Sequence, residues 1–277
     1  DLDYAGNDNP KQKLDLYLPE ERGEEPLPVV CWVHGGGWKS GDKRNGGRVS
    51  RLAATGKYAG ISIGYRLSGE ATWPAQIHDC KAAIRWVRAN AKKYNLDPDR
   101  IAVMGASAGG HLVAMLGVSQ GIDGLEGTIG PNLKESSEVS CVINIFGPAN
   151  FLTLNKYPSR RDHDNSKSPD AQLLGARPSE NKDLAREASP VTHASKDDEP
   201  MLLIHGTRDR LVAHSQSVEL KNALEEAGVS ATLITVKDGG HGRGFGPTVQ
   251  ELIGKFLAIQ LRGEEGSIED QTILAGE

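Results

Sequence analysis

Short apolar runs alternate with helix-like stretches along most of the chain, and this alternation restricts the folds that the chain can adopt. Several runs are almost continuous Val, Ile and Leu, which is typical of strands buried on both faces of a sheet. Strand–helix–strand order predicts an α/β fold, with a mostly parallel twisted sheet and helices on both faces. The predicted strands cover residues 14–18, 29–33, 61–65, 101–104, 139–146, 201–205 and 232–236.

The stretches between these runs have apolar residues at helical spacing. The clearest covers 74–93, where Pro74 suits a first turn and Ile77, Cys80 and Ile84 recur every three or four residues. Ligands of such sheets bind beyond the carboxyl ends of the strands, so the loops after the strands hold the candidate site residues. The other predicted helices follow Ser107 and cover 214–227 and 248–262.

The alternation breaks once, between the strands that end at 146 and begin at 201. The stretch 147–200 is rich in Asn, Asp, Ser, Pro and Arg. A connection this long inside a compact domain is usually a lid, a binding loop or an insertion. We predict a single domain over 1–277, with a cap inserted at about 147–200 and an acidic, peripheral tail over 263–277.

A candidate nucleophile follows the strand 101–104. Gly105-Ala106-Ser107-Ala108-Gly109 matches G-x-S-x-G between a strand and a helix, where small residues allow the sharp turn that exposes the serine. The helix N-terminus also favours the negative charge that develops on a reacting group. The alternative is an ordinary glycine-rich turn, with the serine as the helix N-cap.

A second glycine run, 35–37, directly follows the strand 29–33. Two phosphate loops fail here, because Asp42 stands where a Walker A motif needs Lys and Ser40 stands where the dinucleotide motif needs Gly. The exposed N–H groups of such a run suit an oxyanion, together with the N–H of the residue after the nucleophile. We assign the predicted oxyanion hole to Gly36, Gly37 and Ala108.

A serine nucleophile needs a base, and the base needs a third group that orients it. In the α/β-hydrolase order, the serine is followed by an acid and then by a histidine. His241 lies between glycines after the last predicted strand, and Asp209 follows the strand 201–205. The predicted catalytic residues are therefore Ser107, Asp209 and His241, and Asp238 is too near His241 in sequence to compete as the acid.

The other histidines receive structural interpretations. We expect His34 to support its turn by hydrogen bonding, His205 to be a satisfied core histidine and His214 to face solvent. His111 lies four residues after the candidate nucleophile, and a supporting role beside the site is open to it. His163 lies in an acidic run that lacks the EF-hand pattern, so we interpret that run as a solvated loop.

Composition excludes several function classes. The chain has 277 residues and a net charge of −5, from 32 Lys and Arg against 37 Asp and Glu. Without a basic stripe we expect no nucleic-acid partner, and without about 18 consecutive apolar residues we expect no membrane span. Cys31, Cys80 and Cys141 lack metal-ligand or disulfide spacing and are interpreted as core residues. The sequence carries no signal for an oligomeric state.

Taken in order, these motifs resemble those of α/β-hydrolase esterases, in particular the feruloyl and acetylxylan esterases (BD-FAE-like) related to hormone-sensitive-lipase-like carboxylesterases. Lipase-like members carry Asp where this chain has Ala106, and Ala-Pro-Glu where it has 68–70, which favours the feruloyl and acetyl branch. Arg66 and Asp79 are expected to form a structural ion pair. The matching pieces are 34–38, 65–67, 74–86, 105–112, 205–209 and 239–242.

The resemblance implies a serine carboxylic-ester hydrolase that forms an acyl-enzyme with short or aromatic acyl esters. Feruloyl or acetyl esters of plant polysaccharide are the expected substrates, with no metal and no organic cofactor. An arylformamidase or a small-peptide hydrolase on the same fold is the alternative, and a non-catalytic binding protein is a third. Trp38 is either an aromatic wall that contacts substrate or a core tryptophan.

The resemblance and the first residue also favour an expectation about location. The chain begins with Asp1 rather than Met, so we expect it to be processed or trimmed, with any export signal already removed. A secreted or periplasmic location is therefore favoured over the cytoplasm.

Overall fold

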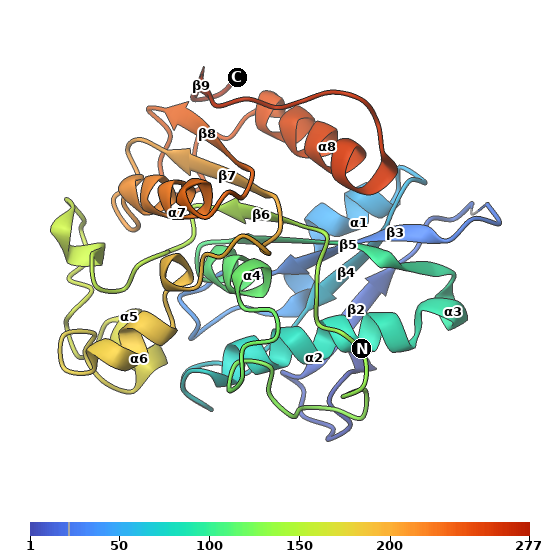
Figure 1. Cartoon of the computed structure of the whole chain (residues 1–277), viewed down its shortest axis with the longest axis horizontal. Coiled ribbons are helices and arrows are strands. Elements are labelled where there is room, and N and C mark those ends of the chain that lie inside the picture. Colours follow the sequence, from blue (N-terminus) through green and yellow to red (C-terminus); the bar gives the residue numbers. More distant parts are fainter. Residues whose placement is uncertain (22) are drawn as a thin grey trace.

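A computed structural model describes residues 1–21 and 23–277, and in this part of the chain nine strands form a single sheet (Figure 1). The spatial order is β1-β2-β4-β3-β5-β6-β7-β8-β9. The pairs β1/β2 and β2/β4 are antiparallel and all the others are parallel, which confirms the predicted mostly parallel sheet. The strands are β1 (Leu2–Asp3), β2 (Lys13–Tyr17), β3 (Leu27–Val33), β4 (Ala59–Ile63), β5 (Leu96–Ala106), β6 (Cys141–Ile145), β7 (Met201–Gly206), β8 (Ala231–Lys237) and β9 (Gln271–Leu274).

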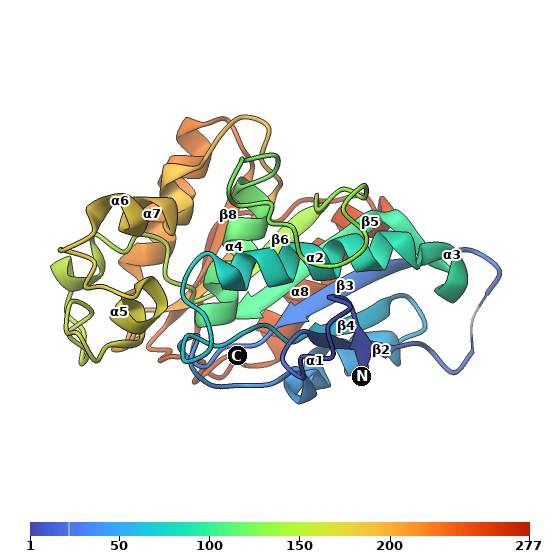
Figure 2. The same ribbon diagram turned by 90° about the horizontal axis from the view of Figure 1, so that it is seen from below.

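Helices cover both faces of this sheet, as predicted. Alternate residues of β3 point to opposite faces: Val30 and Trp32 belong to the apolar cluster under α1 and α8, and Val29 and Cys31 to the cluster under α2, α4 and α7. Figure 2 shows α2 and α4 packed beside each other on the latter face. The α-helices are α1 (Gly47–Ala53), α2 (Ala75–Ala89), α3 (Ala91–Tyr94), α4 (Ala108–Val118), α5 (Pro169–Leu174), α6 (Lys182–Glu187), α7 (Ser215–Glu226) and α8 (Pro247–Arg262), and the 3₁₀ turns are η1 (Lys43–Asn45), η2 (Leu154–Lys156) and η3 (Pro190–Thr192).

The helix predicted over 74–93 is interrupted. Asn90 leaves the helical conformation between α2 and α3, and its side-chain amide donates to the Trp86 carbonyl at 2.9 Å. Helix α1 was not predicted, because its seven residues bury only Val49 and Ala53 and show no clear period.

The C-terminal tail contributes more than the predicted peripheral segment. Strand β9 pairs with β8 at the edge of the sheet, and the Gly276 N–H donates to the Gly244 carbonyl at 2.9 Å in the loop before α8. The sequence of β9 does not show the alternation of a strand, because only Ile273 of its four residues is buried. An edge strand with a single buried residue carries no apolar pattern to detect.

The stretch 147–200 leaves the sheet after β6 and returns at β7, and it contains η2, α5, α6 and η3. It contacts two of the loops that follow strands. The Arg160 N–H donates to the Arg210 carbonyl at 2.7 Å, and a Cβ placed on Gly37 would lie 3.1 Å from Pro169. In Figures 1 and 2, α5 and α6 project beyond one end of the sheet. The single domain and the cap over a substrate stay predictions.

Among the helices of the described residues, none has the length and apolar character that crossing a bilayer requires.

Candidate active site

Ser107 forms the turn between β5 and α4, where its backbone has a φ of 57° and a ψ of −121°. This conformation is strained for a residue with a side chain, and it is possible because small residues flank the turn. A Cβ on Gly105 would lie 2.3 Å from the Gly109 carbonyl oxygen, and a Cβ on Gly109 would lie 2.1 Å from the Val33 carbonyl oxygen. The strand, turn and helix expected around Ser107 are therefore all present.

Three side chains from distant parts of the chain meet at this turn. The hydroxyl of Ser107 lies 2.9 Å from His241 Nε2, and His241 Nδ1 lies 2.6 Å from Asp209 Oδ2. Because the carboxylate accepts a hydrogen bond from the Nδ1–H group, the ring proton stays on Nδ1 and Nε2 is left as an acceptor for the serine hydroxyl. The structure thus brings together the predicted catalytic residues, in an arrangement suited to nucleophilic attack by serine.

Asp209 is held on the loop after β7 by several donors. Its Oδ1 accepts the N–H groups of Leu211 and Val212 at 2.8 and 3.0 Å, and His205 Nε2 lies 3.4 Å from its Oδ2. Burial raises the pKa of the Asp209 carboxyl, but hydrogen bonds from His205 and His241 outweigh this effect and hold the pKa well below its ordinary value. Asp209 is therefore ionised near neutral pH and can stabilise a positive charge on its histidine.

The loop that carries His241 packs closely on the end of β7. A Cβ on Gly206 would lie 2.3 Å from the Gly239 carbonyl oxygen, so this approach requires glycine. The ring of Phe146 packs against the His241 ring, with centroids 4.5 Å apart, and its backbone φ is 44°. Sequence reasoning missed Phe146, although its place directly after β6, at the carboxyl edge of the sheet, was a usable signal.

The glycine run after β3 lies against the turn of Ser107. A Cβ on Gly35 would lie 2.7 Å from the Ala106 carbonyl oxygen and 3.4 Å from the serine Cβ. Within the described residues, the N–H groups of Gly36 and Gly37 have no acceptor. The N–H of Ala108 is also available, because the first N–H groups of a helix lack intrahelical partners. The predicted oxyanion donors therefore lie on the two segments that adjoin the serine.

Trp38 does not form an open wall for substrate. Its indole is 2% exposed, donates to His111 Nδ1 at 3.2 Å and packs against Phe151. Of its two expected roles, the burial of the ring supports that of a core tryptophan. The apolar pattern could not decide this, because the covering residue Phe151 comes from the stretch 147–200.

The remaining histidines are mostly structural. His34 contacts the Gly35 carbonyl at 2.8 Å, in line with its expected support of the turn, and buried His205 lies 2.7 Å from Ser217 Oγ and 2.9 Å from the Val212 carbonyl. His214 is half-buried rather than facing solvent, and burial lowers its pKa to about 4.

His163 also departs from its expected solvated loop. Its ring is 2% exposed, with Nδ1 3.0 Å from Asp170 Oδ2 and Nε2 3.0 Å from the Leu211 carbonyl. The run around it therefore folds against the loop of Asp209. Across residues 1–21 and 23–277, no group of three or more His, Cys, Asp or Glu side chains could hold a metal ion.

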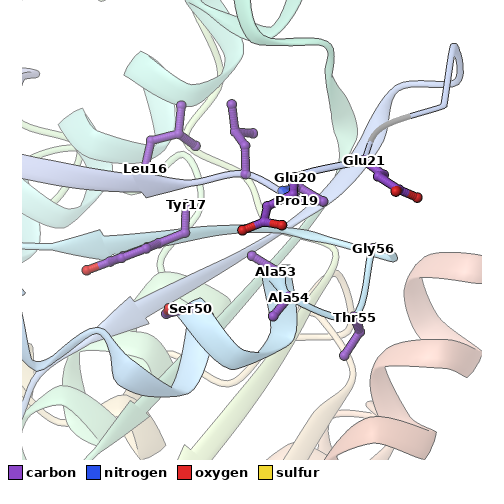
Figure 3. Close-up of a pocket in the computed structure, with 11 residues that line it drawn as sticks. Leu16, Tyr17, Pro19, Glu20, Glu21, Ser50, Ala53, Ala54, Thr55 and Gly56 are labelled. Carbon is purple, nitrogen blue, oxygen red and sulfur yellow. The ribbon is translucent and has the colours of Figure 1, made fainter.

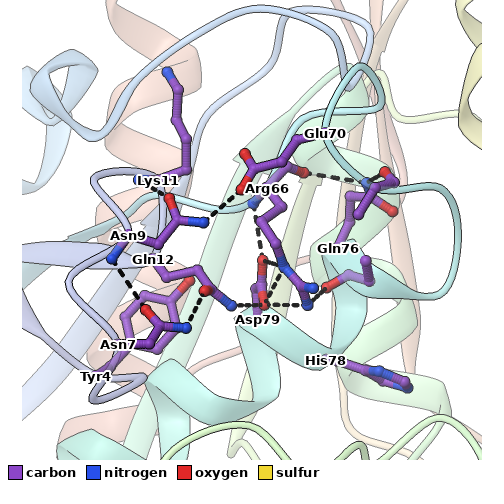
Figure 4. A network of polar contacts seen from close by, with 12 residues as sticks. Tyr4, Asn7, Asn9, Lys11, Gln12, Arg66, Glu70, Gln76, His78 and Asp79 are labelled. Carbon is purple, nitrogen blue, oxygen red and sulfur yellow. Dashed lines mark hydrogen bonds and ion pairs between the residues drawn. The ribbon is translucent and has the colours of Figure 1, made fainter.

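A network of polar contacts lies around the buried carboxylate of Asp79 (Figure 4). The predicted ion pair is confirmed: Arg66 Nη2 donates to Asp79 Oδ1 at 2.7 Å, and the Arg66 N–H donates to the same carboxylate at 2.8 Å. Gln12 Nε2 also donates to this carboxylate, at 2.7 Å. The neighbouring Tyr65 hydroxyl donates to the His34 carbonyl at 2.9 Å, which links the network to the start of the glycine run.

A pocket of about 850 Å³ lies away from these residues, between β2 and α1 (Figure 3). Its lining includes Tyr17, which pairs with Gly60 near the amino end of β4. Since the serine follows the carboxyl end of β5, this pocket lies at the opposite edge of the sheet. It is therefore not the candidate active site.

Comparison with known proteins identifies relatives over most of the chain. The profile of the BD-FAE family matches residues 14–224. Esterase LipC of Mycobacterium tuberculosis is 32% identical over 240 residues, which are 85% of this chain and 58% of LipC. The chain spans about half the length of the curated relatives that it matches.

Solved structures match over the whole fold. A truncated carbohydrate esterase from gut microbiota is 36% identical with a TM-score of 0.84, and the match covers 94% of this chain and 95% of that one. An acetyl ester-xyloside bifunctional hydrolase from Caldicellulosiruptor lactoaceticus is 26% identical with a TM-score of 0.75, and the match covers 91% of this chain and 89% of that one. The sheet and helices described above therefore have the fold of α/β-hydrolase esterases.

Proposed function

The chain belongs to the BD-FAE family, and we propose that it is a serine esterase that removes acetyl groups from plant polysaccharide. The observation that carries the proposal is the continuous contact from Ser107 through His241 to Asp209, beside glycine N–H groups that have no acceptor in the described part of the chain. The likeness to a carbohydrate esterase and an acetyl ester-xyloside hydrolase supports the choice of substrate class.

The proposed reaction has two half-reactions. The oxygen of Ser107 attacks the ester carbonyl carbon while its proton passes to His241 Nε2. The carbonyl oxygen takes the negative charge and accepts N–H groups of the glycine run and of Ala108. When the intermediate collapses, the histidine returns the proton to the leaving alcohol and an acyl-serine remains. Water then attacks this acyl-serine in the same manner and releases the acid.

Burial of the indoles near the site favours a small acyl group over a feruloyl group. Trp38 and Trp73 are 2% and 4% exposed, and the Trp73 indole donates to Glu187 at 3.0 Å. Neither ring face is therefore open to stack on a ferulate ring. An acetyl group needs no such wall.

The experiment is a labelling and hydrolysis panel with the wild type, Ser107→Ala and the control Ser195→Ala, which changes an exposed serine that bonds Asp198. We expect a fluorophosphonate to label the wild type and the control but not Ser107→Ala, whose kcat should fall roughly 10⁶-fold. Acetylated xylan and p-nitrophenyl acetate should be hydrolysed faster than methyl ferulate and long-chain esters. Preferred release of formate from N-formylkynurenine, or preferred cleavage of a small peptide, would instead establish the alternatives, and an unlabelled wild type would refute the serine mechanism.

A further inference from the structure

The proposed oxyanion hole is divided between two elements that must keep a fixed spacing. Gly36 and Gly37 lie on the loop after β3, whereas Ala108 opens α4. Donors act on a developing charge only if they are already aimed at it. The loop continues into Trp38, whose φ of 55° is in a region that bulky residues rarely adopt, so surrounding contacts must hold it there.

One side-chain hydrogen bond joins the two elements directly. Trp38 Nε1 donates to Nδ1 of His111, which lies one helical turn beyond Ser107 on α4. The two rings meet edge to face, with centroids 5.3 Å apart and an interplanar angle of 86°. His111 has no exposed surface and the indole has almost none, so water does not compete for this bond.

The partners of His111 fix its tautomer. Nδ1 must lack a proton in order to accept the indole N–H, so the single proton of the neutral ring is on Nε2. Nε2 donates that proton to the Ala188 carbonyl at 2.7 Å. Burial lowers the pKa of His111 to about 4, in agreement with a neutral ring. Ala188 directly follows α6, so one ring connects the glycine loop, the helix of the nucleophile and the stretch 147–200.

Other contacts enclose this junction. The rings of Trp73 and Phe151 pack against His111, with centroids 5.5 and 5.3 Å away. On the backbone side, the Ser68 N–H donates to the Trp38 carbonyl at 2.8 Å. The indole hydrogen bond is therefore the polar contact that ties the tryptophan side chain to α4, while its neighbours pack around it.

We propose that His111 is a positioning residue, which acts through Trp38 to hold the oxyanion loop at its working distance from the serine. This inference rests on the proposed function, because an oxyanion hole matters only to an acyl-transfer enzyme. His111 does not touch the reacting atoms. Its contribution is therefore expected in transition-state stabilisation rather than in substrate binding.

Substitutions at two positions separate the two hydrogen bonds of His111. In His111→Asn, an amide oxygen replaces Nδ1 at the same bond distance from Cβ, so the acceptor for the indole is kept and the donor to Ala188 is lost. In His111→Gln, the amide N–H takes the place of Nε2, so the donor is kept and the acceptor is lost. Trp38→Phe removes the indole N–H directly. His193→Gln is the matched control, because His193 Nε2 contacts the carbonyl of Glu187, the residue before Ala188, at 2.7 Å.

The kinetic readout uses kcat and KM per fluorophosphonate-labelled site. We expect His111→Gln and Trp38→Phe to lose roughly 10-fold to 100-fold in kcat with little change in KM, which is below the ~10²–10³ for removal of an oxyanion donor. A trifluoromethyl ketone, which forms an oxyanion when the serine adds to it, should bind more weakly by the same factor. His111→Asn should stay within about threefold of the wild type, and His193→Gln should match it.

Hydrogen exchange of the 34–40 segment gives a second readout that does not require activity. We expect faster amide exchange there in His111→Gln and Trp38→Phe, and wild-type exchange in His111→Asn and the control. The inference is overturned if His111→Gln and Trp38→Phe keep wild-type kcat and wild-type exchange. It is also overturned if His111→Asn and His111→Gln lose the same factor in kcat. Lack of labelling in the wild type would refute the proposed function, whereas the exchange pattern would still decide the role of His111.

Discussion

Replacement of Asp209 by Asn tests the proposed catalytic contact most directly, because the structure fixes which way the new amide must point. Oδ1 of Asp209 accepts two backbone N–H groups, from Leu211 and Val212, and Oδ2 faces His241 Nδ1 at 2.6 Å. An amide NH₂ cannot accept the two backbone donors, so the amide oxygen keeps the Oδ1 position. The NH₂ group is then directed at His241.

This orientation reverses the tautomer of the base. With an N–H donor opposite it, Nδ1 must accept, and the ring proton moves to Nε2, where it faces the hydroxyl of Ser107 at a distance of 2.9 Å in the wild type. A protonated Nε2 cannot take the serine proton. The expected loss is about 10⁴-fold in kcat, or about 5 kcal/mol of transition-state stabilisation at 1.36 kcal/mol for each factor of ten.

The assay is hydrolysis of p-nitrophenyl acetate by Asp209→Asn, with far-UV and near-UV circular dichroism to establish that the variant is folded. The matched control is Asp238→Asn, because this carboxylate lies close to His241 in sequence but pairs with Arg208 at 2.8 Å on the surface. We expect the control to keep its activity. A folded Asp209→Asn within 100-fold of the wild type, or an equal loss in the control, would show that the assignment of the acid is wrong.

Three further changes have distinct expected outcomes. Gly36→Ala should lower kcat by roughly 10²–10³-fold, measured with p-nitrophenyl acetate, because its φ is 117° and the new Cβ would lie 2.1 Å from the Ser40 carbonyl oxygen; an active variant would contradict the assigned donor. Asp79→Asn should lower the free energy of unfolding in urea by about 3 kcal/mol, because Arg66 loses its buried counter-charge; an unchanged midpoint would argue against this. Stability should also fall on acidification, because unfolded His111 gains a proton below its ordinary pKa of 6.5 whereas the folded ring gains one only near its pKa of about 4. The loss in the free energy of unfolding that is due to His111 is small above pH 6.5 and reaches about 2 kcal/mol at pH 5. Urea titrations of His111→Asn should therefore show a shallower pH dependence than those of the wild type.

Much of the fold and of the candidate site could be predicted because the decisive signals are local. Strand β3 is a continuous apolar run, and such a run can only be buried on both faces. The turn at Ser107 needs Gly105 for a local steric reason, because an added Cβ would meet the carbonyl oxygen of Gly109, four residues along the chain. The acid and the histidine follow from the order of strands, since the loops after parallel strands gather at one edge of the sheet.

The sequence could not determine which side chains are buried by distant segments. It left Trp38 equally suited to a substrate wall and to a core, and it wrongly predicted a solvated His163. Phe151 and Leu211, which contact them, are separated from them by many residues in the chain. Phe146 was missed because its contact with His241 crosses from the end of β6 to the loop after β8.

The amino-acid sequence by itself determined the parallel sheet, the sharp turn of the serine and the order of the residues proposed for catalysis, because backbone geometry and strand order require these residue types. Only the tertiary structure decided which polar side chains are buried and what they bond to, as with the tautomer of His111 between Trp38 and Ala188. The physical reason is that burial, and with it the protonation of a histidine, depends on neighbours that the fold brings together from remote parts of the chain.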